Sequence, residues 1–303
     1  MKATREKMIT MARATTPRNV VVYLLVGLAT TLLAALLLGL SPMSTPACTC
    51  PSTIQPSHLS SPSQHRLAVL VPFRDRFDEL LDFVPHMSNF LRNLDHHIFV
   101  LNQVDHFRFN RASLINSGFS EVREHYDYIA MHDVDLLPLN PELSYSYPSE
   151  GPFHVASPSL HPRYHYPTFV GGILLISRQH FTLVNGMSNK YWGWGLEDDE
   201  FYVRLKDAGL TVHRPANLSS GTKHTFKHNH ERSRRKRDMT KCYKQQEITR
   251  KRDRKTGLAD VKYAMKTKRL LTIDGHQCTV LDIALQCDRE LTPWCDCSDA
   301  PKT

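Results

Sequence analysis

Between Leu67 and His132 the apolar residues alternate between the spacing of a strand and the spacing of a helix. Three continuous apolar runs have the length of buried strands, and two segments between them carry apolar residues at helical intervals, the first with Asp75 placed to cap it. Strand, helix, strand, helix and strand in succession predict a parallel sheet, and therefore an α/β fold. The expected strands are 67–72, 98–101 and 128–132, and the expected helices are 77–94 and 108–117.

The acidic triplet Asp133-Val134-Asp135 directly follows the third of these strands. In open α/β sheets, ligands bind at the carboxyl ends of the strands. Two carboxylates at that edge suit Mg²⁺ or Mn²⁺ bound to a diphosphate. The triplet therefore favours a metal-dependent enzyme that acts on a nucleotide sugar. The alternative interpretation is an acidic, solvated turn.

Four consecutive carboxylates, 197–200, open a further expected helix that runs to residue 208 and is closed by Gly209. Four carboxylates exceed what capping needs, because like charges repel, although an ordinary helix start is also acidic. A carboxylate here that is ionised at pH 7 could accept a proton from a hydroxyl group. The preceding Trp192-Gly193-Trp194-Gly195 is typical of a hinged loop that closes over a substrate, or of a tryptophan buried in the core. Another strand is expected at 172–177.

Two histidines, His228 and His230, lie in a segment that we expect to be extended. Residues i and i+2 of a strand point to the same face, so both imidazoles could reach one ion. Together with Asp135 they would form a mixed oxygen and imidazole set, which suits Mn²⁺ better than Mg²⁺. The chain has 17 histidines, so chance proximity is the alternative.

The amino-terminal part of the chain is patterned as a membrane anchor. Residues 20–40 form an uncharged apolar run of 21 residues, which as a helix would be about 30 Å long and match a bilayer core. Basic residues precede this run and none follows before Arg66, which predicts a cytosolic amino terminus. We therefore expect a tail at 1–19, a transmembrane signal anchor at 20–40, a Ser/Pro-rich stem at 41–65 and a lumenal domain at 66–303. A cleaved signal peptide is the alternative.

Seven cysteines fit an oxidising compartment. Cys48 and Cys50 lie in the stem, and the cluster from Cys287 to Cys297 predicts a carboxyl-terminal tail pinned by disulfides. A zinc site is the alternative, but Cys295-Asp296-Cys297 lacks the spacing of a zinc finger. Asn217 begins an N-glycosylation acceptor that is usable only in the lumen.

The formal net charge of +8 is concentrated in residues 232–237 and 241–255. Behind a membrane anchor, nucleic acid is excluded as a partner. A nucleotide diphosphate, an acidic proteoglycan core protein and a sulfated polysaccharide are the partners that such charge favours. The alternative for 241–255 is a solvated helix face.

Six motifs spread in order over Arg66 to Trp294 resemble the β-1,4-galactosyltransferase family, and more narrowly its xylosylprotein 4-β-galactosyltransferase branch, which acts on the glycosaminoglycan linker. The resemblance implies a GT-A (Rossmann-like) fold, a type II Golgi membrane anchor and Mn²⁺-dependent, inverting transfer of galactose from UDP-galactose to a sugar 4-hydroxyl. In this branch the acceptor is xylose on a proteoglycan core protein. The motifs are VPFRDRFDELL, NQVDHFRFNRASLIN, HDVDLLPLN, FVGGILLIS, MSNKYWGWGLEDDEFYVRL and TFKHNH.

The resemblance also implies roles for matching residues. Asp135, His228 and His230 would bind the metal, and Asp198 would be the catalytic base. It implies that the acceptor is bound by Glu197, Asp199, Leu196 and Tyr166. On the donor side it implies Pro72, Phe73, Arg74, Asp75, Arg76, Phe109, Asn110, Arg111, Val134, Asp135, Tyr164, Trp194 and Arg237, with Trp194 closing over the donor and Arg237 reaching the diphosphate.

Three positions depart from the wider family pattern. Thr225 stands where most members carry a methionine ligand, and His230 would supply the missing ligand. Leu196 replaces a glycine and should disfavour an acceptor with a bulky N-acetyl group. Phe169 replaces a tyrosine, so one hydrogen bond to the donor would be absent. The rival hypotheses are a β-1,4-galactosyltransferase acting on N-acetylglucosamine and a non-catalytic lumenal module that binds polysaccharide.

Overall fold

The computed structural model describes residues 21–22, 24–31, 65–230 and 235–300. The chain divides into two compact units, Met1–His58 and Leu59–Thr303. In the first unit, residues 21–22 and 24–31 are helical and exposed. No helix within the described ranges has both the length and the hydropathy of a membrane span. The predicted tail, most of the predicted anchor and all of the stem except His65 lie outside the described residues, so those assignments stay predictions.

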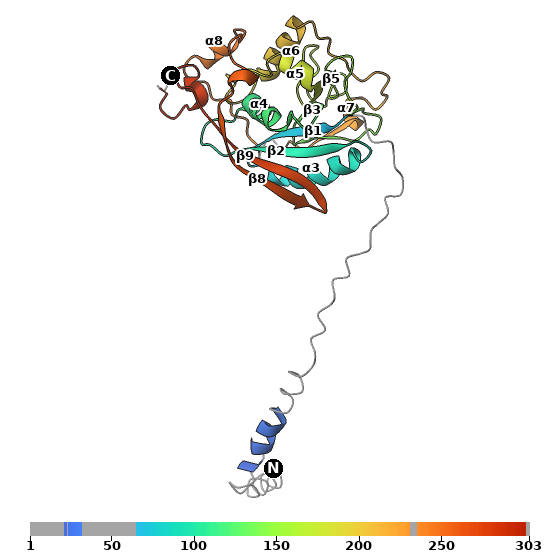
Figure 1. Cartoon of the computed structure of the whole chain (residues 1–303), viewed down its shortest axis with the longest axis vertical. Coiled ribbons are helices and arrows are strands. Elements are labelled where there is room, and N and C mark those ends of the chain that lie inside the picture. Colours follow the sequence, from blue (N-terminus) through green and yellow to red (C-terminus); the bar gives the residue numbers. More distant parts are fainter. Residues whose placement is uncertain (1–20, 23, 32–64, 231–234, 301–303) are drawn as a thin grey trace, which may run out of the picture. The chain divides into compact units, whose positions relative to one another are not determined.

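A seven-stranded mixed sheet lies at the centre of the second unit, in the order β5-β6-β3-β1-β2-β9-β8 (Figure 1). The three predicted strands are confirmed: β1 lies between β3 and β2 and is parallel to both. The sheet is not parallel throughout, because β6 is antiparallel to β3 and β8 is antiparallel to β9. Its strands are β1 (Leu67–Phe73), β2 (His96–Gln103), β3 (Tyr128–His132), β5 (Phe153–His154), β6 (Ile173–Ser177), β8 (Tyr263–Ile273) and β9 (His276–Leu285).

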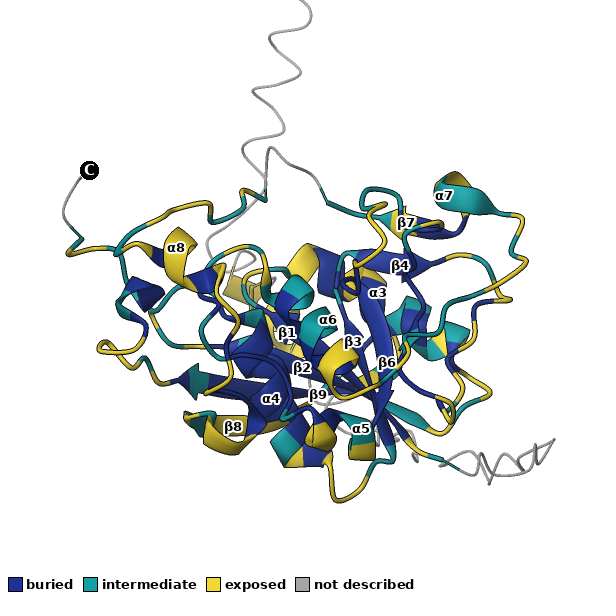
Figure 2. Cartoon of the chain, turned by 90° about the horizontal axis from the view of Figure 1, so that it is seen from above, coloured by how far each residue is buried: buried dark blue, intermediate teal, exposed yellow. Residues whose placement is uncertain are grey.

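Two helices cover opposite faces of this sheet. Phe83 of α3 packs in the core cluster on one face, and Phe119 of α4 packs in the cluster on the other. Strand β1 is buried on both faces, which explains its continuous apolar sequence (Figure 2). The helices are α3 (Phe77–Phe90), α4 (Arg111–Val122), α5 (Arg178–Leu183), α6 (Glu197–Asp207), α7 (Gly221–His224) and α8 (Gln245–Thr249), with single turns η1 (Leu258–Asp260) and η2 (Pro293–Cys295).

One predicted helix cap and one predicted helix start are wrong. Asp75 does not cap α3: it has a φ of 53°, and the position before the helix is Arg76, which makes no capping bond. The second helix begins at Arg111 rather than at Arg108, because Asn110 caps it by accepting a 2.8 Å hydrogen bond from the backbone N–H of Ser113. The end of α6 is as expected, since Gly209 has a φ of 73° just after the helix.

The carboxyl-terminal hairpin β8–β9 has no counterpart among the predicted strands. Most of β8 is exposed and carries lysine and arginine, so it lacks the apolar run that marks a buried strand. The disulfide prediction is confirmed, with bonds Cys242–Cys297 and Cys287–Cys295. Cys278 is free and buried, whereas Cys48 and Cys50 lie outside the described residues.

Packing of α3 against the sheet gives the first testable prediction. Phe83 is fully buried, whereas Phe77 on the same helix is 62% exposed. Replacing Phe83 by alanine should lower the free energy of unfolding by about 3–5 kcal/mol, because the transfer energy of the ring is lost and a cavity remains. Urea denaturation of both alanine variants measures this. An equal loss in Phe77→Ala would contradict the assignment of the core.

Candidate active site and metal centre

A short two-stranded sheet brings the acidic triplet beside the histidine pair. Strand β4 (Leu136–Pro138) begins right after Asp135 and pairs antiparallel with β7 (Phe226–His228), so that Leu136 lies opposite His228. The backbone N–H of Asn229 also donates to the carbonyl of Asp135 over 2.8 Å. Backbone pairing therefore joins two motifs that are far apart in the sequence.

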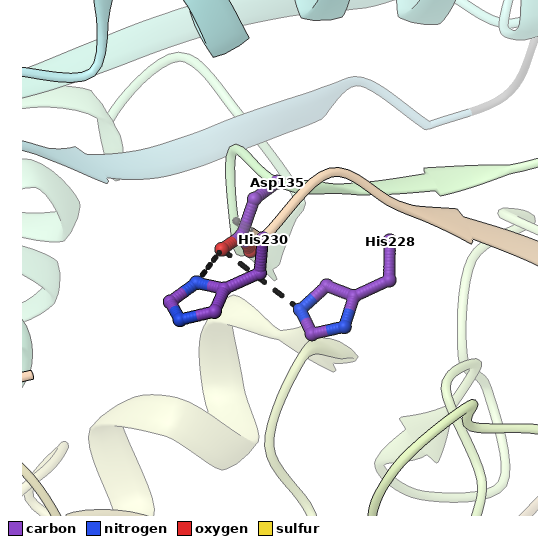
Figure 3. A group of neighbouring side chains, drawn as sticks. All are labelled: Asp135, His228 and His230. Atoms are coloured by element: carbon purple, nitrogen blue, oxygen red, sulfur yellow. Dashed lines mark hydrogen bonds and ion pairs between the residues drawn. The ribbon is translucent and has the colours of Figure 1, made fainter. Parts of the chain in front are cut away.

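The three predicted metal ligands form one cluster in which potential ligand atoms of Asp135, His228 and His230 all lie within 4.8 Å of one another (Figure 3). The Asp135 carboxylate lies 3.0 Å from Nδ1 of His230 and 3.9 Å from Nε2 of His228. The two imidazole rings stack, with centroids 5.6 Å apart. One carboxylate oxygen and two imidazole nitrogens at this spacing fit a divalent transition metal such as Mn²⁺.

Electrostatics keep this cluster in a form that can bind a cation. Burial alone would raise the pKa of Asp135, but the hydrogen bond with His230 and the charges of His228 and Arg76 hold it below its ordinary value. Burial lowers the pKa of His228, against the opposing effect of Asp135. An ionised carboxylate and a neutral imidazole are the protonation states that metal binding requires.

Arg111 joins the acidic triplet to the carboxylates of α6. Its Nε donates to Asp133 and its Nη1 to Asp198, each over 2.9 Å. Burial alone would lower the pKa of Arg111, but the two carboxylates outweigh it and raise the pKa. The Arg111 side chain is only 12% exposed, so these charge-assisted bonds are shielded from water. Arg111 was expected to bind the donor, and the structure places it between Asp133 and Asp198.

The amino end of α6 holds the predicted base. Burial raises the pKa of Asp198, and Arg111 opposes that rise. Burial and the neighbouring Asp198 also raise the pKa of Glu197. A methyl group at Gly171 would collide with the Asp198 carboxylate, so the glycine pair of the FVGGILLIS motif gives this side chain room. A partly desolvated carboxylate with a raised pKa is a stronger base than one in water.

On the rim of the site, Leu196 has a φ of 75° and is 41% exposed, and Tyr166 is also 41% exposed. Asp199 lies beside Tyr166, whose hydroxyl donates to it. Phe169 is buried against the rings of Tyr164 and Tyr166. A group of aromatic and apolar side chains therefore lies next to the α6 carboxylates.

Trp194 and Arg237 contact each other. The Arg237 guanidinium lies 4.4 Å from the centroid of the Trp194 indole, and it donates a 2.6 Å hydrogen bond to the hydroxyl of Tyr164. The backbone N–H of Trp194 donates to the carbonyl of Asp238 over 3.0 Å. The predicted cover and the predicted diphosphate contact are therefore neighbours.

Several predicted donor residues have structural partners. Arg74 donates to the carbonyls of Gln103, Phe107 and Asp105, with its guanidinium 5.9 Å from the ring of Phe109. Asn110 caps α4 and also donates to the carbonyl of Asn189. Arg76 lies 3.2 Å from Glu79 and 3.7 Å from Asp135, so it is held beside the metal cluster. Pro72, Phe73, Asn110 and Val134 are the buried members of this set, and of these only Asn110 has a polar side chain.

Sequence reasoning missed two features of the site. The sequence marks Thr225 only as a missing ligand, yet its hydroxyl hydrogen-bonds to Ser220 and to the carbonyl of Gly221 and so fixes the start of β7. Arg108 was not singled out, although it bonds to Asp238 and to the carbonyl of Trp294. No local pattern marks Arg108, because its partners are more than 100 residues away.

Removal of one imidazole tests the metal centre. His230→Ala should weaken Mn²⁺ binding at least about tenfold, since even residues that only support a metal ligand typically contribute that much. Calorimetric titration with Mn²⁺ measures the change. His276→Ala, at the start of β9 and outside the cluster, is the matched control. Equal affinity in both variants would remove His230 from the metal site.

Two family models match adjacent parts of the chain. The N-terminal region of glycosyl transferase group 7 matches residues 46–148, and a model described as the N-terminal domain of galactosyltransferase matches residues 151–231. Together they cover the acidic triplet, the α6 carboxylates and both histidines of the cluster.

Curated relatives match over most of their length. β-1,4-Galactosyltransferase 7 of Drosophila melanogaster is 63% identical over 80% of this chain and 76% of its own. The human β-1,4-galactosyltransferase 7 is 58% identical over 83% of this chain and 78% of its own. Xylosylprotein 4-β-galactosyltransferase of Caenorhabditis elegans is 51% identical over 77% of this chain and 83% of its own.

Solved structures agree with the sequence matches. The catalytic domain of Drosophila β-1,4-galactosyltransferase 7 in complex with xylobiose is 64% identical and superimposes with a TM-score of 0.76, covering 77% of this chain and 100% of the solved one. An aspartate-to-asparagine mutant of that protein, in complex with manganese, UDP-galactose and xylobiose, gives the same TM-score. The expected GT-A class of fold is thereby confirmed for the second unit. The chain belongs to the β-1,4-galactosyltransferase family and to its xylosylprotein 4-β-galactosyltransferase branch.

Proposed function

We propose that this protein transfers galactose from UDP-galactose to the 4-hydroxyl of xylose on a proteoglycan core protein, with inversion at the anomeric carbon and with Mn²⁺ as cofactor. The observation that carries the proposal is the convergence of two sets of side chains. Arg111 bonds both to Asp198 and to Asp133, which lies two residues before Asp135 of the metal cluster. The solved Drosophila relative, which holds manganese, UDP-galactose and xylobiose together, supports the same assignment.

The mechanism assigns the proton to Asp198. An inverting transfer needs one base on the acceptor side, and Asp198 would take the proton of the xylose 4-hydroxyl as that oxygen attacks the anomeric carbon. Arg111 keeps the Asp198 carboxylate oriented and favours its ionised form. Glu197, whose pKa is raised, would donate a hydrogen bond to the acceptor rather than compete for its proton.

Departure of UDP needs charge neutralisation rather than a proton. Mn²⁺, when bound at Asp135, His228 and His230, supplies positive charge to the diphosphate. Arg237 lies at the opening beside Trp194 and Tyr164, and its guanidinium would bind the same phosphates from the other side. Trp194 would cover the donor and exclude water from the reacting carbon.

The residues next to the α6 carboxylates would suit a small pentose as acceptor. Leu196 places an apolar side chain directly before the α6 carboxylates, and the positive φ at this position fixes its direction from the backbone. Together with Tyr166 and the Asp199 side chain, it would line the acceptor sugar and leave little room for an N-acetyl group. The buried Phe169 has no hydroxyl group to offer the donor galactose.

We also propose that the catalytic unit is lumenal and anchored in the Golgi membrane by residues 20–40. The uncharged run, the preceding basic residues and the two disulfides of the catalytic unit support this location. Asn217 is exposed, as a glycosylated asparagine must be.

The acceptor assignment is tested with two acceptors offered side by side. The purified protein with UDP-galactose and Mn²⁺ should galactosylate an aryl xyloside and leave an aryl N-acetylglucosaminide unchanged, because Leu196 excludes the N-acetyl group. Released UDP and the linkage of the product, determined by NMR, are the readouts. Transfer to N-acetylglucosamine would move the protein to the wider family, and no transfer to either acceptor would favour a binding module.

The base assignment is tested with Asp198→Asn. This change should reduce transfer by at least about 10³-fold, within the range that general base catalysis contributes, while UDP and Mn²⁺ bind as in the wild type. Asp207→Asn, at the other end of α6, is the matched control and should retain activity. Simultaneous loss of UDP binding in Asp198→Asn would show that Asp198 has a structural role instead.

A further inference from the structure

Arg108 is a buried arginine outside the metal cluster and the α6 carboxylates. Its side chain is only 10% exposed, and its Nε donates a 2.6 Å hydrogen bond to the Asp238 carboxylate. Nη2 donates to the carbonyl of Thr240, and Nη1 donates both to Gln245 and to the carbonyl of Trp294. One guanidinium therefore holds two separate segments, 238–245 and the carboxyl-terminal tail.

The carboxyl-terminal tail that contacts Arg108 is itself held by burial, hydrogen bonds and a disulfide. Trp294 is fully buried, and its indole N–H donates to the carbonyl of Lys190 over 2.8 Å. The backbone N–H of Arg108 donates to the carbonyl of Cys295 over 2.9 Å. The Cys242–Cys297 disulfide ties the tail covalently to the segment 238–245. Arg108 thus lies where the segment 238–245 and the carboxyl-terminal tail are joined by a disulfide and by hydrogen bonds.

The same group of contacts extends to the tryptophan loop, 192–194. The Gln245 amide that faces Arg108 also donates to the carbonyl of Trp192 over 2.7 Å. The Asp238 carbonyl accepts from Trp194, and the carbonyl of Phe109 accepts from Gly193 over 2.8 Å.

Close packing supports this connection. A side chain at Gly193 would overlap the Arg108 guanidinium, so the loop lies directly on this arginine. All three residues of the loop are held by Arg108, by its neighbour Phe109 or by partners of Arg108.

We propose that Arg108 is a positioning residue for the donor side of the site, which sets Trp194 and Arg237 against each other so that they form one cover over the UDP-sugar. Arg237 directly precedes Asp238, and its guanidinium lies 4.4 Å from the Trp194 ring. The inference rests on the proposed function, because it assigns a donor role to these two side chains. Within the described ranges, Arg108 bonds to none of the metal-cluster residues and not to Asp198.

The Arg108→Lys variant separates the contribution of the positive charge from that of the planar hydrogen-bonding geometry. An ammonium group retains the charge that Asp238 needs, but it cannot reach Asp238, Thr240, Gln245 and Trp294 with one planar fork. If Arg108 only stabilised the fold, Arg108→Lys would lower the amount of folded protein and the melting temperature while the remaining enzyme kept its donor KM. A positioning role predicts a change in the donor KM of the folded protein.

The experiment compares Arg108→Lys with Arg269→Lys in the full chain. Arg269 on β8 also pairs with an aspartate, Asp282 over 3.0 Å, but at the edge of the sheet. Arg108→Lys should raise the KM for UDP-galactose at least about tenfold with kcat changed much less, because lost uniform binding appears in KM. Mn²⁺ affinity should be unchanged, and Arg269→Lys should match the wild type. An unchanged donor KM in folded Arg108→Lys would overturn the proposal.

A second variant keeps the test decisive if Arg108→Lys does not fold. Asp238→Asn preserves the backbone carbonyl that binds Trp194 but removes the ion pair, and it should raise the donor KM in the same direction. Where both fold, the double variant should be no worse than the more impaired single one, because both changes break one interaction. Fully additive effects, or a wild-type donor KM in Asp238→Asn, would contradict the proposal.

Calorimetric titration of UDP with Mn²⁺ separates this inference from the proposed function. A wild-type protein that binds UDP but transfers to neither acceptor would refute the proposed function, and the loss of UDP affinity in Arg108→Lys would still support the positioning role. A wild-type protein that transfers galactose, with UDP affinity equal in the wild type and both variants, would refute the positioning role alone.

Discussion

The buried guanidinium of Arg111 connects the two halves of the site. It bonds to Asp133 at the end of β3 and to Asp198 at the start of α6, so the donor side and the acceptor side are held at a fixed separation. Two carboxylates this close would otherwise repel and become protonated. The arginine lets both remain near the reacting groups, and α4 holds the arginine itself at its first residue, directly after the Asn110 cap. Catalytic geometry therefore depends on where α4 begins.

The backbone supplies the rest of the arrangement. Pairing of β4 with β7 sets Asp135 opposite the histidine segment, so the metal cluster requires no long or flexible side chain. The carboxyl-terminal tail carries two disulfides, and its Trp294 carbonyl accepts a hydrogen bond from Arg108, which contacts the tryptophan loop. The metal side is thus built on a strand pair, whereas the cover is built on loops fixed to a cross-linked tail.

The sequence predicts those parts of the site whose geometry is local. An apolar run that ends in Asp133-Val134-Asp135 places carboxylates at a strand end, and the i, i+2 spacing of His228 and His230 places both rings on one side. The role of Arg74 could not be predicted, because its partners are carbonyls of a loop about 30 residues away. Strand β8 escaped prediction because it is exposed and basic, whereas β9 was missed although most of it is buried. Long-range hydrogen bonds and solvated strands leave no periodic signal.

One metal ion should lie among Asp135, His228 and His230, while Asp133 and Asp198 stay bound to Arg111. Anomalous diffraction at the manganese edge, from crystals grown with Mn²⁺ and UDP-galactose, tests it most directly. We expect one anomalous peak within coordination distance of an Asp135 oxygen and of a nitrogen from each histidine. A peak coordinated by Asp133 or Asp198 instead, or no peak at the cluster in crystals that contain UDP-galactose, would contradict it.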